Sequence, residues 1–465
     1  MPATKTPAAD QFAWETQPAA ARWVQRAIDS LVARQPVLDR LRRVLRDQTG
    51  TRLVDWVDHL ALGGEETSAL CRELVGVGYV ADDDGEPTVW RHPLGMFPPV
   101  LVDGGSDGVG LRVESVEAGL AALPGVLGLA AADVGAAVGE RGGILRRARL
   151  GAANGVGLSI IERHGHPGFT TPRVDKAQIN AAARNLDAFR RRQRRWATAD
   201  EGFDHASELF AAASDEVGID WACDLFFQAE REYWQSRNRA GRVQYERQNR
   251  LGLGWANHDH HTYRSSRAAF PRLIAALEQM GFKCRERFYA GREAGWGAQV
   301  IEQPQCRVTI FADVDLTPDE VAGDFAHQAF GEREEGLGTV GLWCELHGEA
   351  FLEAGMHHLE CQFDFDAARA QLAAVGIETM APFTDFPYLR QAFTRGEMWP
   401  VDPRRIERLL AAGEITAEQA IRFGREGALG SHLEILERND GYKGFNQTGI
   451  SEIITRTDPR RVFGA

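Results

Sequence analysis

Histidines that could bind a metal gather in the C-terminal half of this chain. Eight of the thirteen fall between residues 258 and 432, namely His258, His260, His261, His327, His347, His357, His358 and His432. Histidine is the commonest metal ligand in proteins and the usual proton carrier near neutral pH. This local excess indicates a site, although composition alone does not separate a metal centre from a solvated histidine-rich surface.

Three segments in this region alternate as β-strands do, so that residues i, i+2 and i+4 share one face. Each segment presents one polar face: His260, Thr262 and Arg264 in HDHHTYR (258–264), His358, Glu360 and Gln362 in MHHLECQFDF (356–365), and His432 and Glu434 in SHLEILER (431–438). The opposite faces of the second and third segments are apolar and suited to packing on helices. Three polar faces would therefore meet on the inner side of one sheet.

One ligand from each strand would give two imidazoles and one carboxylate, from His260, His358 and Glu434. This set leaves coordination positions open and is the facial triad associated with non-heme Fe(II) oxygen chemistry. Polar strand faces that are merely solvated remain the alternative. A second choice of ligands is the pair Glu345 and His347 in LWCELHGE, in which His347 would substitute for an exposed His358.

The elements that must position these residues occur twice along the chain. VDHLAL (57–62) corresponds to HDHHTY (258–263), and each is followed by a predicted helix. Later, GLSIIERHG (157–165) corresponds to HLEILERND (432–440). We interpret these paired signals as an internal duplication of a unit built from a strand, a helix and a run of strands.

The first copy lacks most of the ligand set. His59 matches His260, but Ser159 stands where the second copy has Glu434, and the strand at 111–117 supplies no histidine. A single imidazole does not hold Fe(II) against water. We therefore expect the first copy to be structural, as an interface or a lid.

The changes of pattern divide the chain into four parts of an α+β protein. They are N-terminal helices (1–50), a module without a full metal triad (51–173), a charged helical linker or cap (174–250) and a metal-bearing module (251–465). The basic run RRRQRR (190–195) within the linker is expected to be a solvated helix face. The sequence leaves open whether this linker caps the site formed by the strands, bridges the two modules or forms a homo-oligomer.

Composition excludes several classes of partner. The 465 residues include 53 Lys and Arg against 66 Asp and Glu, so the formal net charge of −13 argues against nucleic acid or an anionic membrane. No apolar run is long enough to span a membrane, and the first residues lack a signal core. Six scattered cysteines without a CxxC pair fit reduced thiols, so we expect a cytoplasmic protein.

The repeated unit with its His, His and Glu strands resembles the vicinal oxygen chelate superfamily. That resemblance implies tandem βαβββ-type modules with curled mixed sheets around one metal. NHDHHTYRSS followed by LEQMGFKCRERF resembles the 2-oxoadipate dioxygenase/decarboxylase family, also called hydroxyglutarate synthase. In the DHxxxR phrase of that family, His260 would bind metal and Arg264 a substrate carboxylate. GMHHLECQFDF and HLEILERND are also similar to 4-hydroxyphenylpyruvate dioxygenase, which implies that His358 and Glu434 are ligands.

These resemblances imply an Fe(II)-dependent dioxygenase that decarboxylates and hydroxylates a small-molecule 2-oxo acid, with O2 as co-substrate. Arg264 lies about 13 Å along its strand from His260, at about 3.3 Å per residue, a reach that suits a distant carboxylate. His432 and Gln362 are further candidates for catalytic roles. By resemblance, Phe445 and Asn446 in KGFNQTGISEII (443–454) are pocket residues, with core packing as the alternative for Phe445.

Three other functions remain open at this point. The ligand set also suits a non-oxidative metalloenzyme, an isomerase, lyase or hydrolase with Ni, Mn or Zn, because ligand sets overlap between metals. An aryl-pyruvate dioxygenase would share the iron site but not the need for Arg264. A metal-free protein could use the same cup to bind a small acid.

Overall fold

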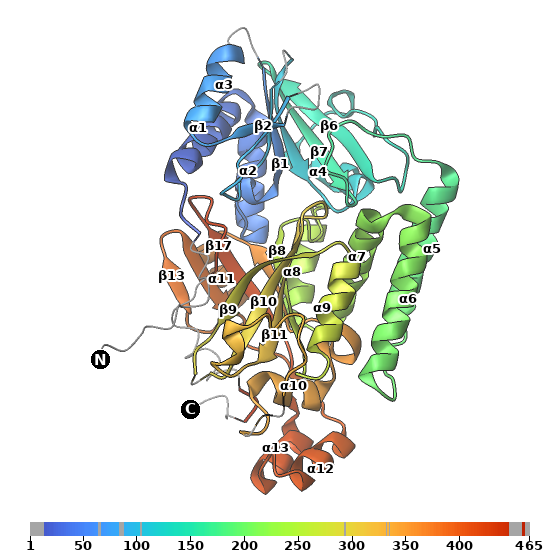
Figure 1. The fold of residues 1–465 in the computed structure, drawn as a ribbon. Coiled ribbons are helices and arrows are strands. Elements are labelled where there is room, and N and C mark those ends of the chain that lie inside the picture. The colour runs from blue at the N-terminus through green and yellow to red at the C-terminus, as the bar shows by residue number, and fades with distance from the viewer. Residues whose placement is uncertain are drawn as a thin grey trace, which may run out of the picture.

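The computed structural model describes residues 14–63, 67–82, 88–102, 105–292, 294–331, 333, 335–445 and 458–460. Within these ranges the chain forms one mixed β-sheet above another, with a group of helices along one side (Figure 1). In this part of the chain no helix is long and apolar enough to cross a membrane.

The N-terminal helices are α1 (Pro18–Arg34) and α2 (Pro36–Thr49). The helix breaks between them because Pro36 has no backbone N–H to donate and begins α2 instead. The short 3-10 helix η1 (Leu53–Trp56) then leads into the first sheet. One apolar core joins α1 and α2 to that sheet.

The first sheet contains β1 (Val57–Leu62), β2 (Val80–Asp82), β3 (Thr88–Arg91), β4 (Val100–Val102), β5 (Asp107–Arg112), β6 (Leu145–Ala153) and β7 (Val156–Arg163). Its strand order is β2-β3-β4-β1-β5-β7-β6. With α3 (Thr67–Gly76), the strands β1 to β4 form one βαβββ unit in which β1 and β4 are parallel. With α4 (Val116–Leu127), the strands β5 to β7 form a second unit with one strand fewer. A 3-10 helix, η2 (Ala131–Asp133), precedes β6.

The second sheet contains β8 (His258–Arg264), β9 (Lys283–Tyr289), β10 (Trp296–Gln303), β11 (Val308–Asp315), β12 (His358–Gln362), β13 (Thr384–Phe386), β14 (Leu389–Phe393) and β17 (His432–Arg438). Its order is β13-β14-β17-β12-β8-β11-β10-β9. Each half is a βαβββ unit, with α9 (Phe270–Gln279) in one and α11 (Phe365–Ala374) in the other. Antiparallel pairing of β8 with β12 joins the halves.

The helical segment consists of α5 (Lys176–Arg191), α6 (Ala199–Val217), α7 (Ile219–Ser236) and α8 (Arg239–Asn249). It shares an apolar core with the second sheet. Tyr263 on β8 donates to Glu230 on α7 at 3.2 Å, so α7 covers one face of that sheet. The remaining elements are η3 (Glu320–Ala322), α10 (Thr339–His347), the π-helix η4 (Ala350–Ala354), β15 (Met398–Trp399), α12 (Pro403–Ala411), α13 (Ala417–Glu426) and β16 (Ala428–Leu429).

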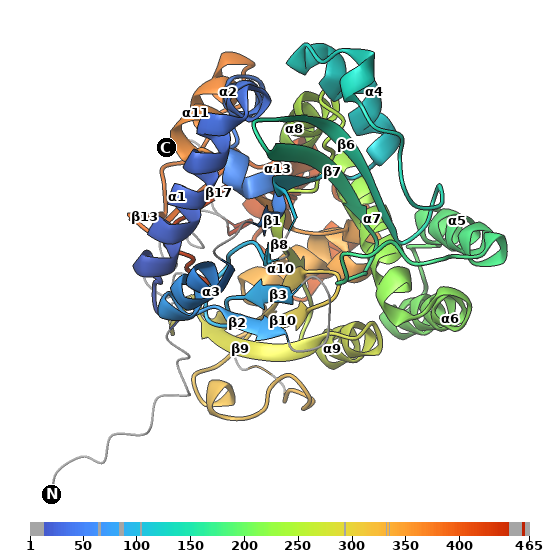
Figure 2. The same ribbon diagram turned by 90° about the horizontal axis from the view of Figure 1, so that it is seen from above.

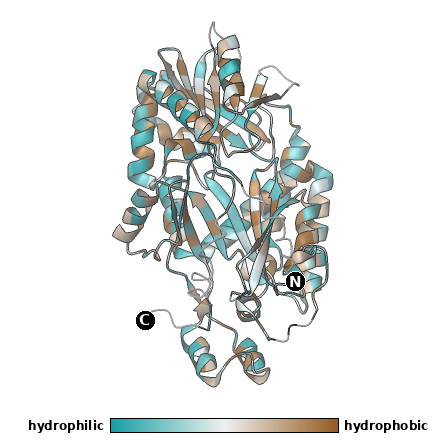
Figure 3. Ribbon diagram, turned by 60° about the vertical axis from the view of Figure 1, so that its left-hand side comes forward, coloured by the Kyte–Doolittle hydropathy of each residue, from teal (hydrophilic) through white to brown (hydrophobic). Residues whose placement is uncertain are grey.

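The predicted fold class is therefore confirmed: an α+β chain with two curled mixed sheets built from βαβββ-type units and connected by a helical segment. Polar and apolar residues both occur along the strands, as expected where one face is buried and the other carries a site (Figure 3). The division of the chain after residues 50, 173 and 250 stays a prediction.

The expectation of a solvated basic run at 190–195 is wrong in part. Arg190 is exposed and pairs with Glu232, but Arg192 and Arg194 both donate to the buried carboxylate of Glu230. Glu230, which is distant in sequence, lies beside these two arginines and orients them toward the interior. The local charge pattern alone does not predict this contact.

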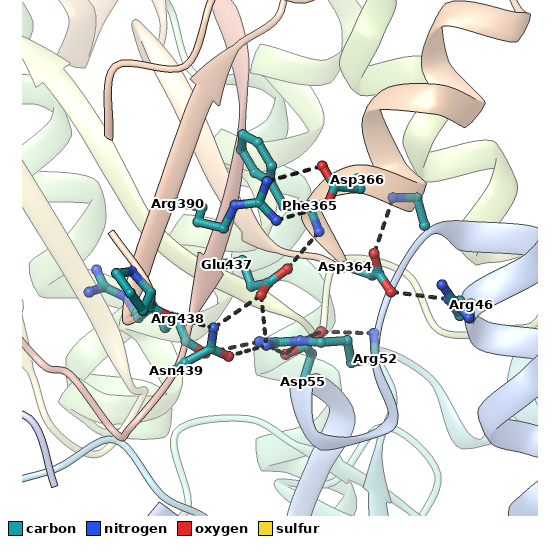
Figure 4. Close-up of polar contacts among 12 residues, drawn as sticks. Arg46, Arg52, Asp55, Asp364, Phe365, Asp366, Arg390, Glu437, Arg438 and Asn439 are labelled. Carbon is teal, nitrogen blue, oxygen red and sulfur yellow. Dashed lines mark hydrogen bonds and ion pairs between the residues drawn. The ribbon is translucent and has the colours of Figure 1, made fainter. Parts of the chain in front are cut away.

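Polar contacts connect the N-terminal helices to the second module. Arg52 donates to Asn439 at 2.7 Å and lies 3.7 Å from Glu437, while Arg46 donates to Asp364 at 3.1 Å (Figure 4). The helices α2 and α11 lie side by side in the view from above (Figure 2). These contacts hold the last strand, β17, against the N-terminal part of the chain.

Candidate metal centre

Four side chains with metal-binding atoms meet on one face of the second sheet. His260 on β8, Glu360 on β12 and Glu434 on β17 have ligand atoms within 4.8 Å of one another. The Oε1 atom of Glu360 lies 2.7 Å from Nε2 of His358 and 3.4 Å from Nε2 of His260. Nε2 of His358 lies 3.9 Å from Oε2 of Glu434. The three residues predicted as ligands are thus together, and Glu360 lies among them.

Strand register explains this convergence. Glu360 pairs with His260 across the antiparallel β8–β12 ladder and with Glu434 across the parallel β12–β17 ladder. His358 pairs with Thr262 in the same way, so it lies on the same face one pleat further along. Thr262 Oγ1 donates to Glu360 Oε1 at 3.0 Å and fixes that carboxylate.

A β-bulge in β8 turns Asp259 toward His260. His258 pairs with Cys361 and His260 with Glu360, so two steps in β8 oppose one step in β12 and Asp259 is the extra residue. Its carboxylate lies 2.8 Å from Nδ1 of His260. This contact leaves Nε2 available to bind a metal, as second-sphere carboxylates do for many metal-bound histidines.

Asp259 is itself held from two sides. Arg438, at the end of β17, forms a bidentate pair with its carboxylate at 2.9 Å, and Gln362 donates to it at 3.0 Å. Gln362 therefore contacts the partner of His260 and not the carboxylate cluster. Burial raises the pKa of Asp259, but the charge of Arg438 and the contact with His260 outweigh it, so the pKa lies below its usual range.

Burial shifts the pKa values of the carboxylates and imidazoles in this cluster toward their neutral forms. Burial raises the pKa of Glu434 to about 8, against the hydrogen bond donated by Gln391, and burial with the neighbouring Glu434 raises the pKa of Glu360. Burial also lowers the pKa of His260 and His358, which favours neutral imidazoles. A metal ion would stabilise two buried carboxylates beside two neutral imidazoles. Oε2 of Glu360 has no hydrogen-bond partner among the described residues.

Arg264, the predicted carboxylate-binding residue, is buried at the far end of β8. Its Nε lies 4.0 Å from Asp313 Oδ2, and its guanidinium lies above the Trp343 ring. Within the described part of the chain, its Nε and Nη1 and Oδ1 of Asp313 have no hydrogen-bond partner. Burial raises the pKa of Asp313 to about 8, although Arg264 opposes this shift. Arg264 is thus a buried cation with two of its donor atoms unpaired within the described residues.

The other predicted residues have different surroundings. His432 is buried beside His357 and His358, with Nδ1 3.1 Å from the Thr394 carbonyl oxygen. Its Nε2 has no partner among the described residues. His347 lies on α10, where Nε2 donates to the Leu429 carbonyl oxygen, so it does not replace His358.

Phe445 packs on the ring of His260. Its ring is perpendicular to that of His260, with centroids 4.9 Å apart, and it also contacts Phe311 at 4.2 Å. Arg438 lies above the other side of the ring. Asn446 lies outside the described residues.

Sequence reasoning placed Glu360 on the correct face but did not select it as a site residue. The signal was present, since Glu360 follows His358 by two residues in a strand. What was missing is the register of β12 against both neighbours, which places Glu360 directly between His260 and Glu434.

The first sheet repeats the surroundings of His260 but has no counterpart of the Glu360 and Glu434 carboxylates. Asp58 lies 2.7 Å from Nδ1 of His59 and receives a bidentate pair from Arg163, as Asp259 does from Arg438. The same kind of β-bulge occurs, because Val57 pairs with Leu111 and His59 with Gly110.

Phe169 occupies in the first sheet the place that Phe445 has in the second. Its ring is perpendicular to that of His59 at 5.1 Å, with Arg163 above it. Gly110 and Ser159 take the positions of Glu360 and Glu434 in the strand ladders. The first sheet therefore has the support of the histidine but neither of the two carboxylates.

Comparison with known proteins finds similar solved structures but no matching family. No family model matches the chain, and no curated protein matches its sequence. A Shewanella frigidimarina protein assigned provisionally as a hydrolase has 11% identity and a TM-score of 0.33, covering 46% of this chain and 92% of its own.

Two further solved structures are similar in part. A methylmalonyl-CoA epimerase from Mycobacterium tuberculosis has 16% identity and a TM-score of 0.22, covering 39% of this chain and 88% of its own. A fusion of a xylose isomerase-like TIM barrel with 4-hydroxyphenylpyruvate dioxygenase has 11% identity and a TM-score of 0.23, covering 88% of this chain and 52% of its own. At these values the likeness does not by itself define an activity.

Proposed function

We propose that this protein is a non-heme Fe(II)-dependent dioxygenase that oxidatively decarboxylates and hydroxylates a 2-oxo acid. The observation that carries the proposal is the meeting of His260, His358 and Glu434 on one buried sheet face. Two imidazoles and a carboxylate suit Fe(II) and leave three of six positions for other groups. Bound iron would supply chelation of the 2-oxo acid and activation of O2.

The residues around the metal ligands orient the ligands and the substrate. Asp259 holds His260 with Nε2 toward the cluster, and Phe445 covers the histidine ring. The substrate class we propose is a dicarboxylic 2-oxo acid resembling 2-oxoadipate, because Arg264 offers a buried guanidinium with unpaired donors to the distant carboxylate. In the reaction the bond between the keto carbon and its carboxylate breaks and CO2 leaves. One oxygen atom of O2 enters the new carboxylate and the other becomes the hydroxyl group.

Glu360 supports a second candidate function. If it binds the metal together with the other three residues, only two of six positions remain open, too few for a chelating 2-oxo acid and O2 at once. A four-residue ligand set therefore favours a non-oxidative metalloenzyme of the same fold. In the dioxygenase, Glu360 is instead a hydrogen-bonding neighbour of the ligands, held by Thr262.

The test is O2 consumption by the iron-loaded full-length protein. The protein is purified anaerobically, its metal content is measured, and O2 uptake and CO2 release are followed with 2-oxoadipate and aryl pyruvates. We expect equal amounts of O2 consumed and CO2 released with 2-oxoadipate, and neither with Glu434→Ala. No uptake with any acid would favour the non-oxidative enzyme. Absence of bound metal, with acid binding unchanged in Glu434→Ala, would indicate a metal-free binding protein.

A further inference from the structure

A cavity of about 700 Å³ lies between the N-terminal part of the chain and the second sheet. The helices α1 and α2, the loop at 91–99, and the ends of β8 and β17 all contribute to its wall. Its described lining residues include nine Arg or Lys and six Asp or Glu. The whole chain has the opposite balance, 53 to 66, so positive charge is concentrated here.

A smaller cavity, of about 60 Å³, adjoins the first. The two share Arg112, His258 and Arg307 as lining residues, and Arg231 also lines the smaller one. The three arginines come from β5, from the turn between β10 and β11, and from α7. Both modules and the helical segment therefore each send one guanidinium to the same space.

Arg112 and Arg307 are half-buried and Arg231 is buried, and none of the three donates a hydrogen bond within the described residues. Within the described residues, Arg112 has no hydrogen bond or ion pair, and Arg231, which is 6% exposed, has Nε and Nη1 buried without a partner. The carboxylate nearest to Arg307 is Asp58, at 3.8 Å. That carboxylate is already bound by both arms of Arg163.

The charge of this group is costly as it stands. Burial, followed by the charge of Arg112, lowers the pKa of Arg307 to about 9, and burial also lowers the pKa of Arg112. Arg307 adopts a left-handed backbone conformation with φ of 56°, which is uncommon for a residue with a side chain. Buried cations are normally paired. The carboxylates of Asp58 and Glu114 act electrostatically on these arginines but receive no hydrogen bond from them within the described residues, and a bound anion would supply that contact.

We propose that Arg112, Arg231 and Arg307 bind an oxyanion group of a small molecule, a phosphate ester or a carboxylate, between the two modules. The cavity volume is in the range of small-molecule sites. Guanidinium groups match the geometry of carboxylates and phosphates and bind them through paired hydrogen bonds. Because the three residues come from different parts of the chain, the bound anion would connect those parts.

This site is separate from the candidate metal centre. His260, His358, Glu360 and Glu434 line neither cavity, although the larger cavity reaches the residues that surround them, Asp259, Gln362, Arg438 and Phe445. The proposal therefore does not rest on the proposed function, and it remains testable in a protein without dioxygenase activity.

The test is calorimetric titration of the full-length protein, at low ionic strength, with inorganic phosphate and separately with succinate. We expect at least one probe to bind, and the tighter one identifies the class of oxyanion. Arg112→Gln and Arg307→Gln should each raise the Kd of that probe about tenfold or more, because each removes a charge-assisted hydrogen bond. Arg149→Gln is the matched control, since Arg149 is an exposed arginine of β6 that lines neither cavity. It should leave the Kd unchanged.

Two results would overturn the proposal. One is no binding of either probe up to about 10 mM. The other is binding that persists in both arginine variants but disappears in Glu434→Ala, which would place the anion at the metal centre. Thermal unfolding of each variant checks that it is folded. If Arg112→Gln is unstable, Arg307→Gln still tests the proposal, because Arg307 lies in a turn and not in a strand.

Discussion

The carboxylate of Glu360 lies 2.7 Å from Nε2 of His358, inside the group of side chains that would bind the metal. Its Oε1 also receives a hydrogen bond from Thr262 at 3.0 Å. A metal ion in this space either takes Glu360 as a fourth ligand or leaves it beside the other three. The number of open coordination positions, and with it the choice between the two candidate functions, depends on this single residue.

For the dioxygenase we expect Glu360→Gln to keep stoichiometric Fe(II) and to lower its affinity about 10- to 100-fold, the usual effect of a residue that supports metal ligands. Glu434→Gln should lose the metal, because it removes a ligand. Anaerobic Fe(II) titration, followed by the absorbance of a competing chelator, measures both. Equal loss of metal in the two variants would show that Glu360 is itself a ligand and would favour the non-oxidative function.

Arg264 should distinguish dicarboxylic from aryl substrates. Its Nε and Nη1 have no hydrogen-bond partner in the described part of the chain, so they are available to the distant carboxylate of a substrate. We expect Arg264→Gln to lower kcat/KM for 2-oxoadipate about tenfold or more, mainly by raising KM. The kcat/KM for phenylpyruvate should change little. Arg264→Lys keeps the positive charge but not the two-pronged guanidinium group, so its kcat/KM for 2-oxoadipate should lie between those of the wild type and Arg264→Gln. Equal losses with both substrates would mean that Arg264 has a structural role.

The fold class could be predicted because the duplication leaves short repeated phrases in the sequence. The Asp-His pairs at 58–59 and 259–260 and the Glu-Arg pairs at 162–163 and 437–438 mark the first and last strands of both sheets. Pro36 is also a local signal, because proline begins a helix more readily than it continues one. Strand alternation also placed His260, Thr262 and Arg264 on one face, because parity within a strand needs no knowledge of its neighbours.

What the sequence could not provide is the relation between strands. Glu360 is recognised only when the register of β12 against β8 and β17 is known, and that register depends on a bulge at Asp259. The contact of Phe169 with His59 depends on a loop that returns to the sheet. Burial of Arg192 depends on α7, which brings Glu230 beside it. The ligand roles of His260, His358 and Glu434 stay predictions that metal binding must test.

His164 should make the stability of the fold depend on pH. Its ring is bound by Asp224 at 2.8 Å and by Glu162 at 3.1 Å. Burial lowers its pKa, but these two carboxylates outweigh burial and raise it to about 10. Because the pKa is higher in the folded state, the stabilisation is complete below about pH 6.5 and is lost as the pH rises toward 10.

Urea unfolding of the wild type and of His164→Gln measures this contribution. At pH 6 we expect the variant to be less stable by about 2 kcal/mol or more, which corresponds to a shift of at least one to two pKa units. The difference should shrink steadily between pH 7 and pH 10. A difference that stays constant over this range would mean that the histidine is not charged in the folded protein.

Gly110 explains why the first sheet cannot carry the ligand set of the second. It takes the position of Glu360, and a Cβ atom built on it would lie 2.6 Å from Nδ1 of His59. We therefore expect Gly110→Ala to destabilise the protein by about 1–3 kcal/mol, the cost of overpacking a closed site. Gly125→Ala is the control, because no atom lies within 4 Å of its Cβ position in α4 and alanine favours helix. It should be neutral or stabilising in urea unfolding.

The double variant His59→Ala with Gly110→Ala should recover part of the lost stability, since the ring that the new methyl group meets is gone. Equal stability of Gly110→Ala and wild type would mean that His59 moves freely, and a carboxylate could then be accommodated beside it.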